Sequence, residues 1–115
     1  MSGILGHWSP CEKDNVDLHG FSRNLAIAAL RHVFLGFLEK PVGFDIGVPD
    51  PFYVIVGRGI HSKGDAVLPD TLTRALGEVF QPPITTIPCH AGRIRIEPNS
   101  VKEWLRGVYM KRLRS

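Results

Sequence analysis

An aspartate and a histidine two positions apart are the first residues of this 115-residue chain that could do chemistry. The segment Asn15-Val-Asp-Leu-His19 alternates polar and apolar residues, which predicts a short strand with Val16 and Leu18 toward the core. Because side chains two apart on a strand share a face, we expect Asp17 and His19 to be neighbours. A carboxylate beside an imidazole can orient the ring, raise its basicity and hold a water or a divalent ion.

Such a pair suits phosphodiester hydrolysis, with His19 as base or acid and Asp17 as the group that orients it. Asp17 is also a candidate ligand for a divalent metal such as Mg²⁺, although a single carboxylate supplies few of the ligands that this ion needs. Two interpretations without chemistry stay open. The residues could form the polar face of a half-exposed strand, or Asp17 could cap the next helix.

A glycine-flanked arginine, Gly57-Arg58-Gly59, is the second candidate site. Glycines let the backbone approach an anion closely, and successive N–H groups can form an anion-binding nest. The Arg58 guanidinium is a planar donor suited to phosphate, and His61, Ser62 and Lys63 extend the polar segment. We expect these residues to bind nucleic acid; a plain tight turn is the alternative.

Arg93 and Arg95 alternate with Ile94 and Ile96, so both arginines are predicted to point away from the core and to contact a nucleic-acid backbone. Arginines that protect an edge strand from aggregation are the alternative. From Arg93 onward the chain carries a net charge of +5, whereas the first 92 residues carry −2. This asymmetry favours a polyanionic partner, although a solvated terminal helix would give the same charge.

The elements that must position these residues follow from hydropathy and turn signals. The pattern predicts strand 15–19, helix 22–40, loop 41–51, strand 52–56, a helix from 69 to about 79, strands 84–87 and 93–96, and a last helix from 99. Two successive strand–helix units imply parallel pairing, and therefore an α/β two-layer sandwich of order βαβαββα with a mixed four-stranded sheet. The carboxyl ends of the parallel strands would bring Asp17, His19 and the segment 57–63 to one edge of that sheet.

Local signals give further expectations. Ser22 is a predicted helix N-cap and Pro41 a helix stop. The continuous apolar run 52–56 indicates a strand covered on both faces. Asn99-Ser100 followed by Glu103 predicts a capping box. The buried stripe of the first helix is expected to contain Leu25, Ala28, Ala29, Val33 and Leu38, widened by Leu30, Phe34 and Phe37. That of the second is expected to contain Leu68, Leu72, Ala75, Leu76 and Val79.

Composition bounds the remaining possibilities. Hydrophobic residues make up 43% of the chain and charged residues 22%, which is ordinary for a globular protein and excludes a disordered tail or a fibre. Residues 1–14 are expected to be a flexible arm or linker before a domain at 15–115. No apolar stretch is long enough to span a membrane, and no secretory signal is visible.

The remaining aromatic, cysteine and histidine residues give weaker signals. Cys11 and Cys89 are most simply idle thiols; a zinc site with His7 and His90 is the alternative. Aromatic residues that could stack on bases are Trp8, Trp104 and Tyr109, of which Trp104 is expected in the core.

At these residues the sequence resembles a Smr (small MutS-related) domain. The first Smr motif, LDxH followed by Gly, is matched by Val16-Asp17-Leu18-His19-Gly20, and the second, TGxG or HGxG, by Val56-Gly57-Arg58-Gly59. Val56 stands where the family carries Thr or His. The continuation Ile60-His61-Ser62 and a later Gly92-Arg93-Ile94-Arg95-Ile96 are similar to the Smr domains that end organellar pentatricopeptide-repeat proteins.

The resemblance implies nucleic-acid binding and endonuclease activity, with Asp17 and His19 in cleavage and the segment 57–59 in contact with nucleic acid. It favours RNA over DNA as the substrate, a monomeric domain tethered to an RNA-binding repeat array, and a mitochondrial or chloroplast location; outside that subfamily we expect a cytoplasmic protein. A non-catalytic RNA- or ribosome-binding module that uses the same surface is the alternative. A protein-interaction domain is a third hypothesis.

Overall fold

The structure is a computed structural model that describes residues 15–39, 43, 45–56, 67–89 and 92–114. In chain order its elements are β1 (Asn15–Asp17), α2 (Arg23–Gly36), the 3₁₀ helix η1 (Phe37–Glu39), β2 (Phe52–Ile55), α3 (Pro69–Val79), β3 (Thr86–Pro88), β4 (Arg93–Ile96) and α4 (Pro98–Arg114). The predicted order βαβαββα is confirmed. The predicted arm at 1–14 lies outside the described residues.

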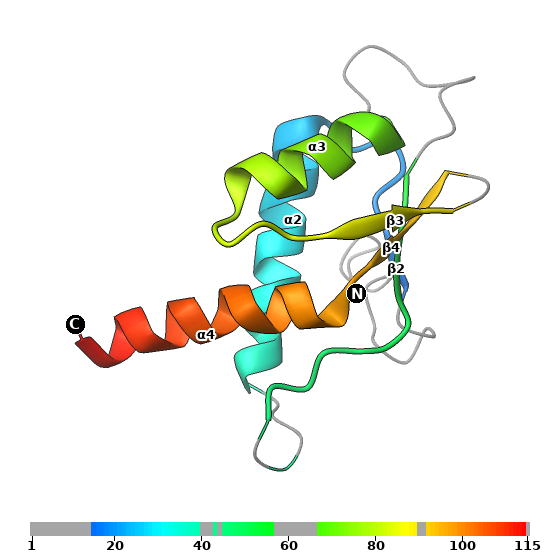
Figure 1. The fold of residues 1–115 in the computed structure, drawn as a ribbon. Coiled ribbons are helices and arrows are strands. Elements are labelled where there is room, and N and C mark those ends of the chain that lie inside the picture. Colours follow the sequence, from blue (N-terminus) through cyan, green and yellow to red (C-terminus); the bar gives the residue numbers. More distant parts are fainter. Residues whose placement is uncertain (1–14, 40–42, 44, 57–66, 90–91, 115) are drawn as a thin grey trace, which may run out of the picture.

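The four strands form one mixed sheet in the order β1-β2-β4-β3. β1 and β2 are parallel, and β4 is antiparallel to both β2 and β3. The three α-helices all lie on one side of this sheet (Figure 1), which confirms the two-layer α/β fold. Because β4 lies between two strands, the idea that Arg93 and Arg95 protect a sheet edge is wrong.

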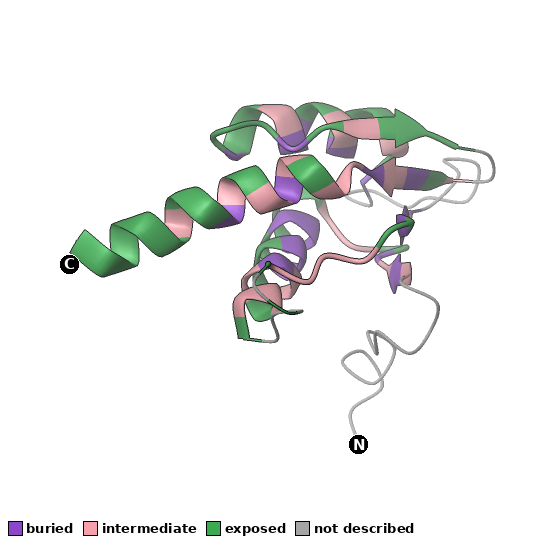
Figure 2. Cartoon of the chain, turned by 60° about the horizontal axis from the view of Figure 1, so that its bottom comes forward, coloured by how far each residue is buried: buried purple, intermediate pink, exposed green. Residues whose placement is uncertain are grey.

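An aromatic cluster fills the space between the sheet and the helices. Phe34 of α2 is fully buried, and its ring centroid lies 5.6 Å from that of Phe80 and 6.2 Å from that of Phe52. Trp104 of α4 lies 4.8 Å from Phe80, edge to face, so its predicted place in the core is confirmed. Figure 2 shows buried residues on the inward sides of the helices and an exposed outer half of α4.

Burial alternates along β2, in contrast to the prediction. Phe52 and Val54 are buried at 1% and 0% exposure, whereas Tyr53 and Ile55 are half-buried. The expectation of a strand covered on both faces is therefore wrong, because the helices cover one face only. We call the opposite side of the sheet the outer face; its residues are Asn15, Asp17, Tyr53, Ile55, Ile87, Arg93 and Arg95.

The first helix begins as predicted, and Ala29, Leu30 and Phe34 of its predicted stripe are buried, but other residues of that stripe are not. The Ser22 hydroxyl accepts the Leu25 N–H at 3.2 Å, which confirms the N-cap. However, Leu25 is 53% exposed and Ala28 is also exposed, and the helix changes to η1 at Phe37, before the predicted end. The helix carries apolar residues on most of its own faces, so the sequence does not determine which face is buried. The buried residues are Ala26, Ile27, Ala29, Leu30 and Phe34.

The later elements show smaller differences. Leu68 and Val79 of the second predicted stripe are exposed, and β3 begins at Thr86 rather than at residue 84. The capping box at Asn99-Ser100 is not formed. The Ser100 hydroxyl instead donates to the Glu97 carbonyl at 2.7 Å, inside a helix that already begins at Pro98. No helix in the described part of the chain combines the length and apolar character that a bilayer span requires.

Candidate functional site

A tight turn after β1 holds Asp17 and His19 together. Leu18 is fully buried, and the Phe21 N–H donates to the Leu18 carbonyl at 3.0 Å, which closes a turn with His19 at its corner. Gly20 has φ of 84°, a backbone conformation that favours glycine. The buried leucine and the glycine thus fix the backbone on both sides of His19, while its side chain stays in solvent.

The predicted contact between the carboxylate and the imidazole is present. Asp17 Oδ1 lies 2.8 Å from His19 Nδ1 and also accepts the His19 backbone N–H at 3.1 Å. With hydrogen on Nδ1, the ring donates to the carboxylate, and Nε2 is then the nitrogen that can accept a proton. The side chains are 74% and 41% exposed for His19 and Asp17, so a polymeric substrate can reach them. Since Ser22 caps α2, the interpretation of Asp17 as the helix cap is wrong.

The strand register places Asp17 in the same row of the sheet as Arg93. Asp17 lies opposite Ile55 of β2, and Ile55 lies opposite Arg93 of β4. Two strand spacings separate Asp17 from Arg93, a Cα distance of about 10 Å. Arg95 lies on the same face one pair further along, opposite Tyr53. The structure thus brings Asp17, Arg93 and Arg95 onto the outer face, as expected for the two arginines.

Tyr53, which lies in the middle of the outer face, was not among the predicted site residues. The Arg93 guanidinium carbon is 5.1 Å from the centroid of the Tyr53 ring, within the range of a cation–π contact. Tyr53 stands inside the continuous apolar run 52–56, where nothing in the sequence separates it from core residues. The register of β2 with β4 supplies the missing signal, since it pairs Tyr53 with Arg95.

The two arginines differ in their availability to a ligand. Arg93 is exposed, and its guanidinium lies over the Tyr53 ring without an ion-pair partner among the described residues. Arg95 is half-buried and donates from Nη2 to Asp50 Oδ1 at 3.3 Å. Its Nε is buried and has no hydrogen-bond partner among the described residues. A phosphate would therefore compete with Asp50 for Arg95, whereas Arg93 can bind it directly.

The predicted phosphate-binding residues Gly57, Arg58, Gly59, His61, Ser62 and Lys63 lie outside the described residues. The residues on either side of this stretch are described. The Val56 N–H donates to the Gly92 carbonyl at 2.7 Å, next to Arg93, and the Val67 N–H donates to the Phe21 carbonyl at 2.7 Å. Val56 and Val67 are thus hydrogen-bonded to residues that adjoin Arg93 and the turn of His19.

The metal sites considered from the sequence find no support in the described residues. These residues contain no group of three or more His, Cys, Asp or Glu side chains that could hold a metal ion. The described residues around Asp17 therefore supply few ligands for Mg²⁺, an ion that is usually held by several oxygen atoms. Cys89 is an exposed free thiol, and its proposed zinc partners Cys11, His7 and His90 lie outside the described residues.

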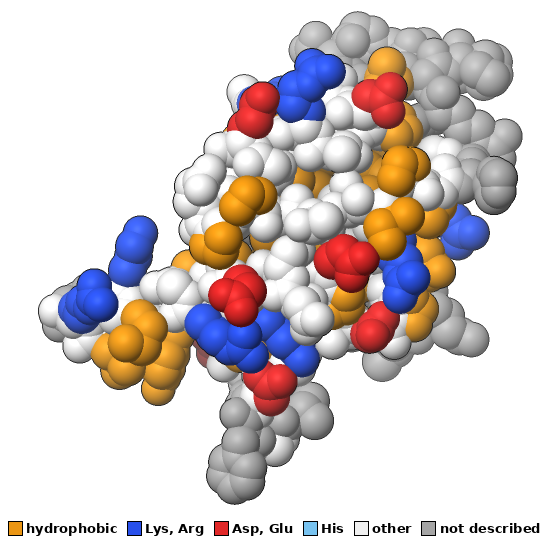
Figure 3. Space-filling view, in the orientation of Figure 1, with side chains coloured by type: hydrophobic (Ala, Val, Ile, Leu, Met, Phe, Trp, Pro, Cys, Tyr) orange, Lys and Arg blue, Asp and Glu red, His pale blue; other side chains and the backbone are white. Residues whose placement is uncertain are grey.

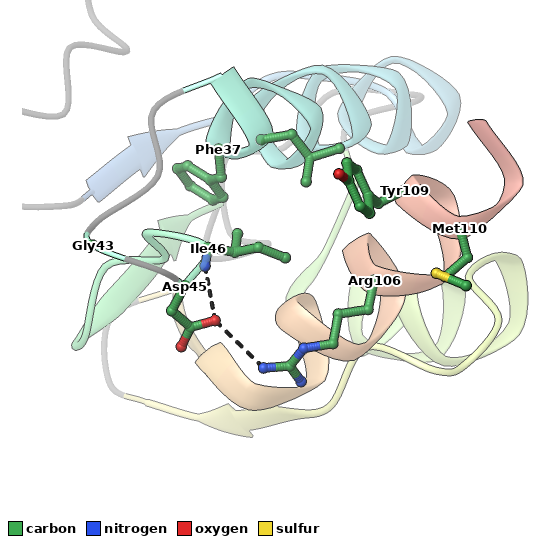
Figure 4. A pocket seen from close by; sticks show the side chains of 8 residues that line it. Phe37, Gly43, Asp45, Ile46, Arg106, Tyr109 and Met110 are labelled. Carbon is green, nitrogen blue, oxygen red and sulfur yellow. Dashed lines mark hydrogen bonds and ion pairs between the residues drawn. The ribbon is translucent and has the colours of Figure 1, made fainter. Parts of the chain in front are cut away.

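A pocket of about 540 Å³ lies on the helix side of the molecule (Figure 4). At its rim, Asp45 accepts hydrogen bonds from Lys102 Nζ at 3.0 Å and from the Ile46 backbone N–H at 2.8 Å. The hydrogen bond from Lys102 and then that from Ile46 lower the pKa of Asp45, with smaller contributions from the charges of Lys102 and Arg106. The contacts of Asp45 with Lys102 and Arg106 connect the loop before β2 to α4. The pocket is lined by Phe37, Leu38, Gly43, Asp45, Ile46, Arg106, Tyr109 and Met110.

The outer half of α4 extends away from the sheet and carries exposed apolar and basic side chains together (Figure 3). Tyr109 is 52% exposed and Leu113 is 62% exposed, beside the basic residues of the last turn. Tyr109, a predicted base-stacking residue, therefore belongs to the helix side and not to the outer face.

No protein-family model matches this sequence, and neither a curated protein nor a solved structure is significantly similar to it. Function must therefore be inferred from the side chains of the outer face and the turn that follows β1.

Proposed function

We propose that this domain binds RNA on the outer face of its sheet and cleaves it as an endonuclease of the Smr type. The observation that carries the proposal is the 2.8 Å contact between Asp17 and His19 in the row of the sheet that also contains Arg93. An oriented imidazole next to a surface cation is what phosphodiester cleavage requires of a protein: a proton acceptor, and a positive group that holds the phosphate.

In this mechanism Asp17 is a positioning residue and His19 the catalytic base. Asp17 holds the imidazole through Nδ1, so Nε2 faces the substrate. Nε2 takes a proton from a water molecule as the water oxygen bonds to phosphorus. The bond from phosphorus to the leaving oxygen then breaks, and that oxygen takes up a proton from solvent. Arg93 neutralises the charge that grows on the phosphate oxygens.

The residues flanking the stretch 57–66 support a role for its basic segment. Val56 and Val67 are bonded to Gly92 and Phe21, which adjoin Arg93 and the turn of His19. We propose that Arg58, together with Gly57 and Gly59, contacts the phosphate next to the one that is cleaved. The resemblance to the organellar subfamily is the reason to propose RNA over DNA, in a mitochondrion or chloroplast.

A second candidate, a non-catalytic RNA- or ribosome-binding module, also has an observation in its favour. Asp17 Oδ1 accepts the His19 backbone N–H as well as contacting the ring, so the aspartate stabilises the turn whether or not the ring reacts. On that alternative the same face binds RNA, and no bond is broken.

One experiment separates the two. Single-stranded and structured RNA, and a DNA of the same sequence, are end-labelled and incubated with the 115-residue chain and with His19→Gln, with and without a chelator. The endonuclease proposal expects scission of RNA by the wild type and a loss of about 100-fold or more in His19→Gln. Binding of equal strength without scission by either protein supports the module; no binding to RNA at low salt contradicts both.

A further inference from the structure

The outer face has a tyrosine at its centre, and this residue narrows the class of RNA that the face can bind. Tyr53 is paired with Arg95 in the register and lies two residues along β2 from Ile55, in the row of Asp17 and Arg93. Its neighbours on β2, Phe52 and Val54, are buried under the helices, whereas Tyr53 is half-buried on the opposite side. Tyr53 is therefore partly accessible from the outer face.

The chemistry around this ring suits a nucleobase. The Arg93 guanidinium carbon lies over the Tyr53 ring, 5.1 Å from its centroid, so a planar cation and an aromatic ring already form one stack on this surface. An aromatic ring and an arginine plane both stack on bases, whatever the base, because every base has a π face. The phosphate that follows a base stacked on Tyr53 would lie near Arg93, in the row whose other end, about 10 Å across the sheet, is Asp17.

We infer that Tyr53 is a base-stacking residue and that the domain selects single-stranded RNA, an inference that rests on the proposed function. Bases in an A-form duplex are stacked on each other and offer no free face, so they cannot lie on Tyr53. An unpaired nucleotide can, with its phosphate held by Arg93 in the row that ends at the Asp17–His19 pair. The inference adds both a residue and a substrate preference to the proposed function.

The first test compares a single-stranded RNA with a duplex of the same sequence, bound by the unaltered chain. We expect at least tenfold tighter binding of the single strand. Equal binding of both would overturn the inference and leave the proposed endonuclease intact. Binding of neither at low salt would contradict the proposed function itself, and the inference with it.

The second test uses a short single-stranded RNA with one 2-aminopurine, whose fluorescence falls when the base stacks. Titration with the wild type should quench the fluorophore. In Tyr53→Leu the quenching should disappear and affinity should fall about tenfold, within the range of one base–aromatic stack. Tyr53→Phe keeps the ring and should behave as the wild type, and Tyr109→Leu is the control on the helix side.

These variants keep the outcome interpretable. Circular dichroism establishes that Tyr53→Leu is folded. If it is not, Arg93→Leu next to an unchanged Tyr53 is used, and the quenching should persist while affinity falls. Undiminished quenching in folded Tyr53→Leu would show that the base stacks elsewhere, and would overturn the assignment of Tyr53 while scission by the wild type still supported the endonuclease.

Discussion

Asp17 and Arg93 occupy one row across the sheet, separated only by Ile55, although 75 residues of sequence lie between them. The parallel pairing of β1 with β2 and the antiparallel pairing of β2 with β4 bring them there. One end of the row carries a carboxylate in contact with an imidazole, and the other carries an exposed guanidinium next to an aromatic ring. A single nucleic-acid strand can therefore contact both ends at once.

Asp17→Asn is expected to separate cleavage from binding. Asparagine keeps an oxygen that can accept the His19 backbone N–H, so the turn should survive, but it loses the charge that stabilises a protonated ring. We expect single-turnover cleavage of labelled RNA to slow about 100-fold or more, with affinity for the RNA changed by less than about twofold. Equal cleavage rates in wild type and variant would remove Asp17 from the mechanism.

Arg93→Ala should weaken binding through the loss of one phosphate contact. For a single strand, the slope of log K against log salt concentration should decrease in magnitude by about 0.7. Arg112→Ala is the matched control, since it removes the same charge from the outer end of α4, away from the outer face. Slopes that change equally in both variants would mean that only net charge matters.

Asp50→Asn should strengthen RNA binding. The substitution removes a carboxylate that holds Arg95 Nη2 at 3.3 Å and releases the guanidinium for a phosphate. Because the pair is largely exposed, we expect a modest gain of about twofold to fivefold at low salt that disappears at high salt. Arg95→Ala should change affinity in the opposite direction. Fluorescence anisotropy measures both, and weaker binding by Asp50→Asn would contradict this role of Arg95.

Asp45→Asn should make the domain slightly less stable in a pH-dependent way. The pKa of Asp45 in the folded protein lies below its ordinary value of 3.8, because Lys102 and the Ile46 N–H bind the ionised form. The ionised carboxylate therefore stabilises the fold at pH values above about 4, and this contribution is lost as the pH falls through the lowered pKa.

Thermal unfolding at several pH values measures this difference. We expect Asp45→Asn to melt below the wild type at pH 6 to 7 and the two curves to converge in acid. Glu78→Gln, a change at an exposed carboxylate of α3, is the control and should shift the melting temperature less. A gap between wild type and Asp45→Asn that widens in acid would show that the cluster with Lys102 does not stabilise the fold.

Phe34→Ala should have a large effect on stability. The side chain is fully buried, and its ring contacts four other aromatic residues from η1, β2, α4 and the end of α3. Removal of a buried phenylalanine leaves a cavity and costs about 3–5 kcal/mol, a large part of the stability of a small domain. Urea denaturation measures the loss; a cost below 1 kcal/mol would mean that Phe34 is not central to the core.

Much of the fold was predictable because its strong signals are local. Ser22 caps the first helix through its own hydroxyl, and Arg93 and Arg95 alternate with two buried isoleucines, so both features could be predicted from neighbouring residues. The contact of Asp17 with His19 was predicted, but the reason was wrong: β1 ends at Asp17 and not at residue 19, and a turn, closed by the Phe21 N–H on the Leu18 carbonyl, brings the imidazole to the carboxylate.

Features that depend on distant parts of the chain could not be predicted in this way. The run 52–56 is apolar throughout, and only the placement of all helices on one side of the sheet exposes Tyr53 on the other. Serine is a residue type that often caps helices. The Ser100 hydroxyl nevertheless donates to the Glu97 carbonyl and accepts the Thr85 N–H from another segment. The position of β4 inside the sheet likewise depends on pairing that no local pattern encodes.

The most direct test of the outer face as the RNA-binding surface is an NMR titration of the ¹⁵N-labelled chain with a short single-stranded RNA. Amide shift changes should concentrate on His19, Tyr53, Ile55, Arg93 and Arg95, and leave Tyr109, Met110 and Leu113 of α4 unchanged. Changes confined to α4 and the pocket beside it, with the sheet amides unmoved, would contradict the account.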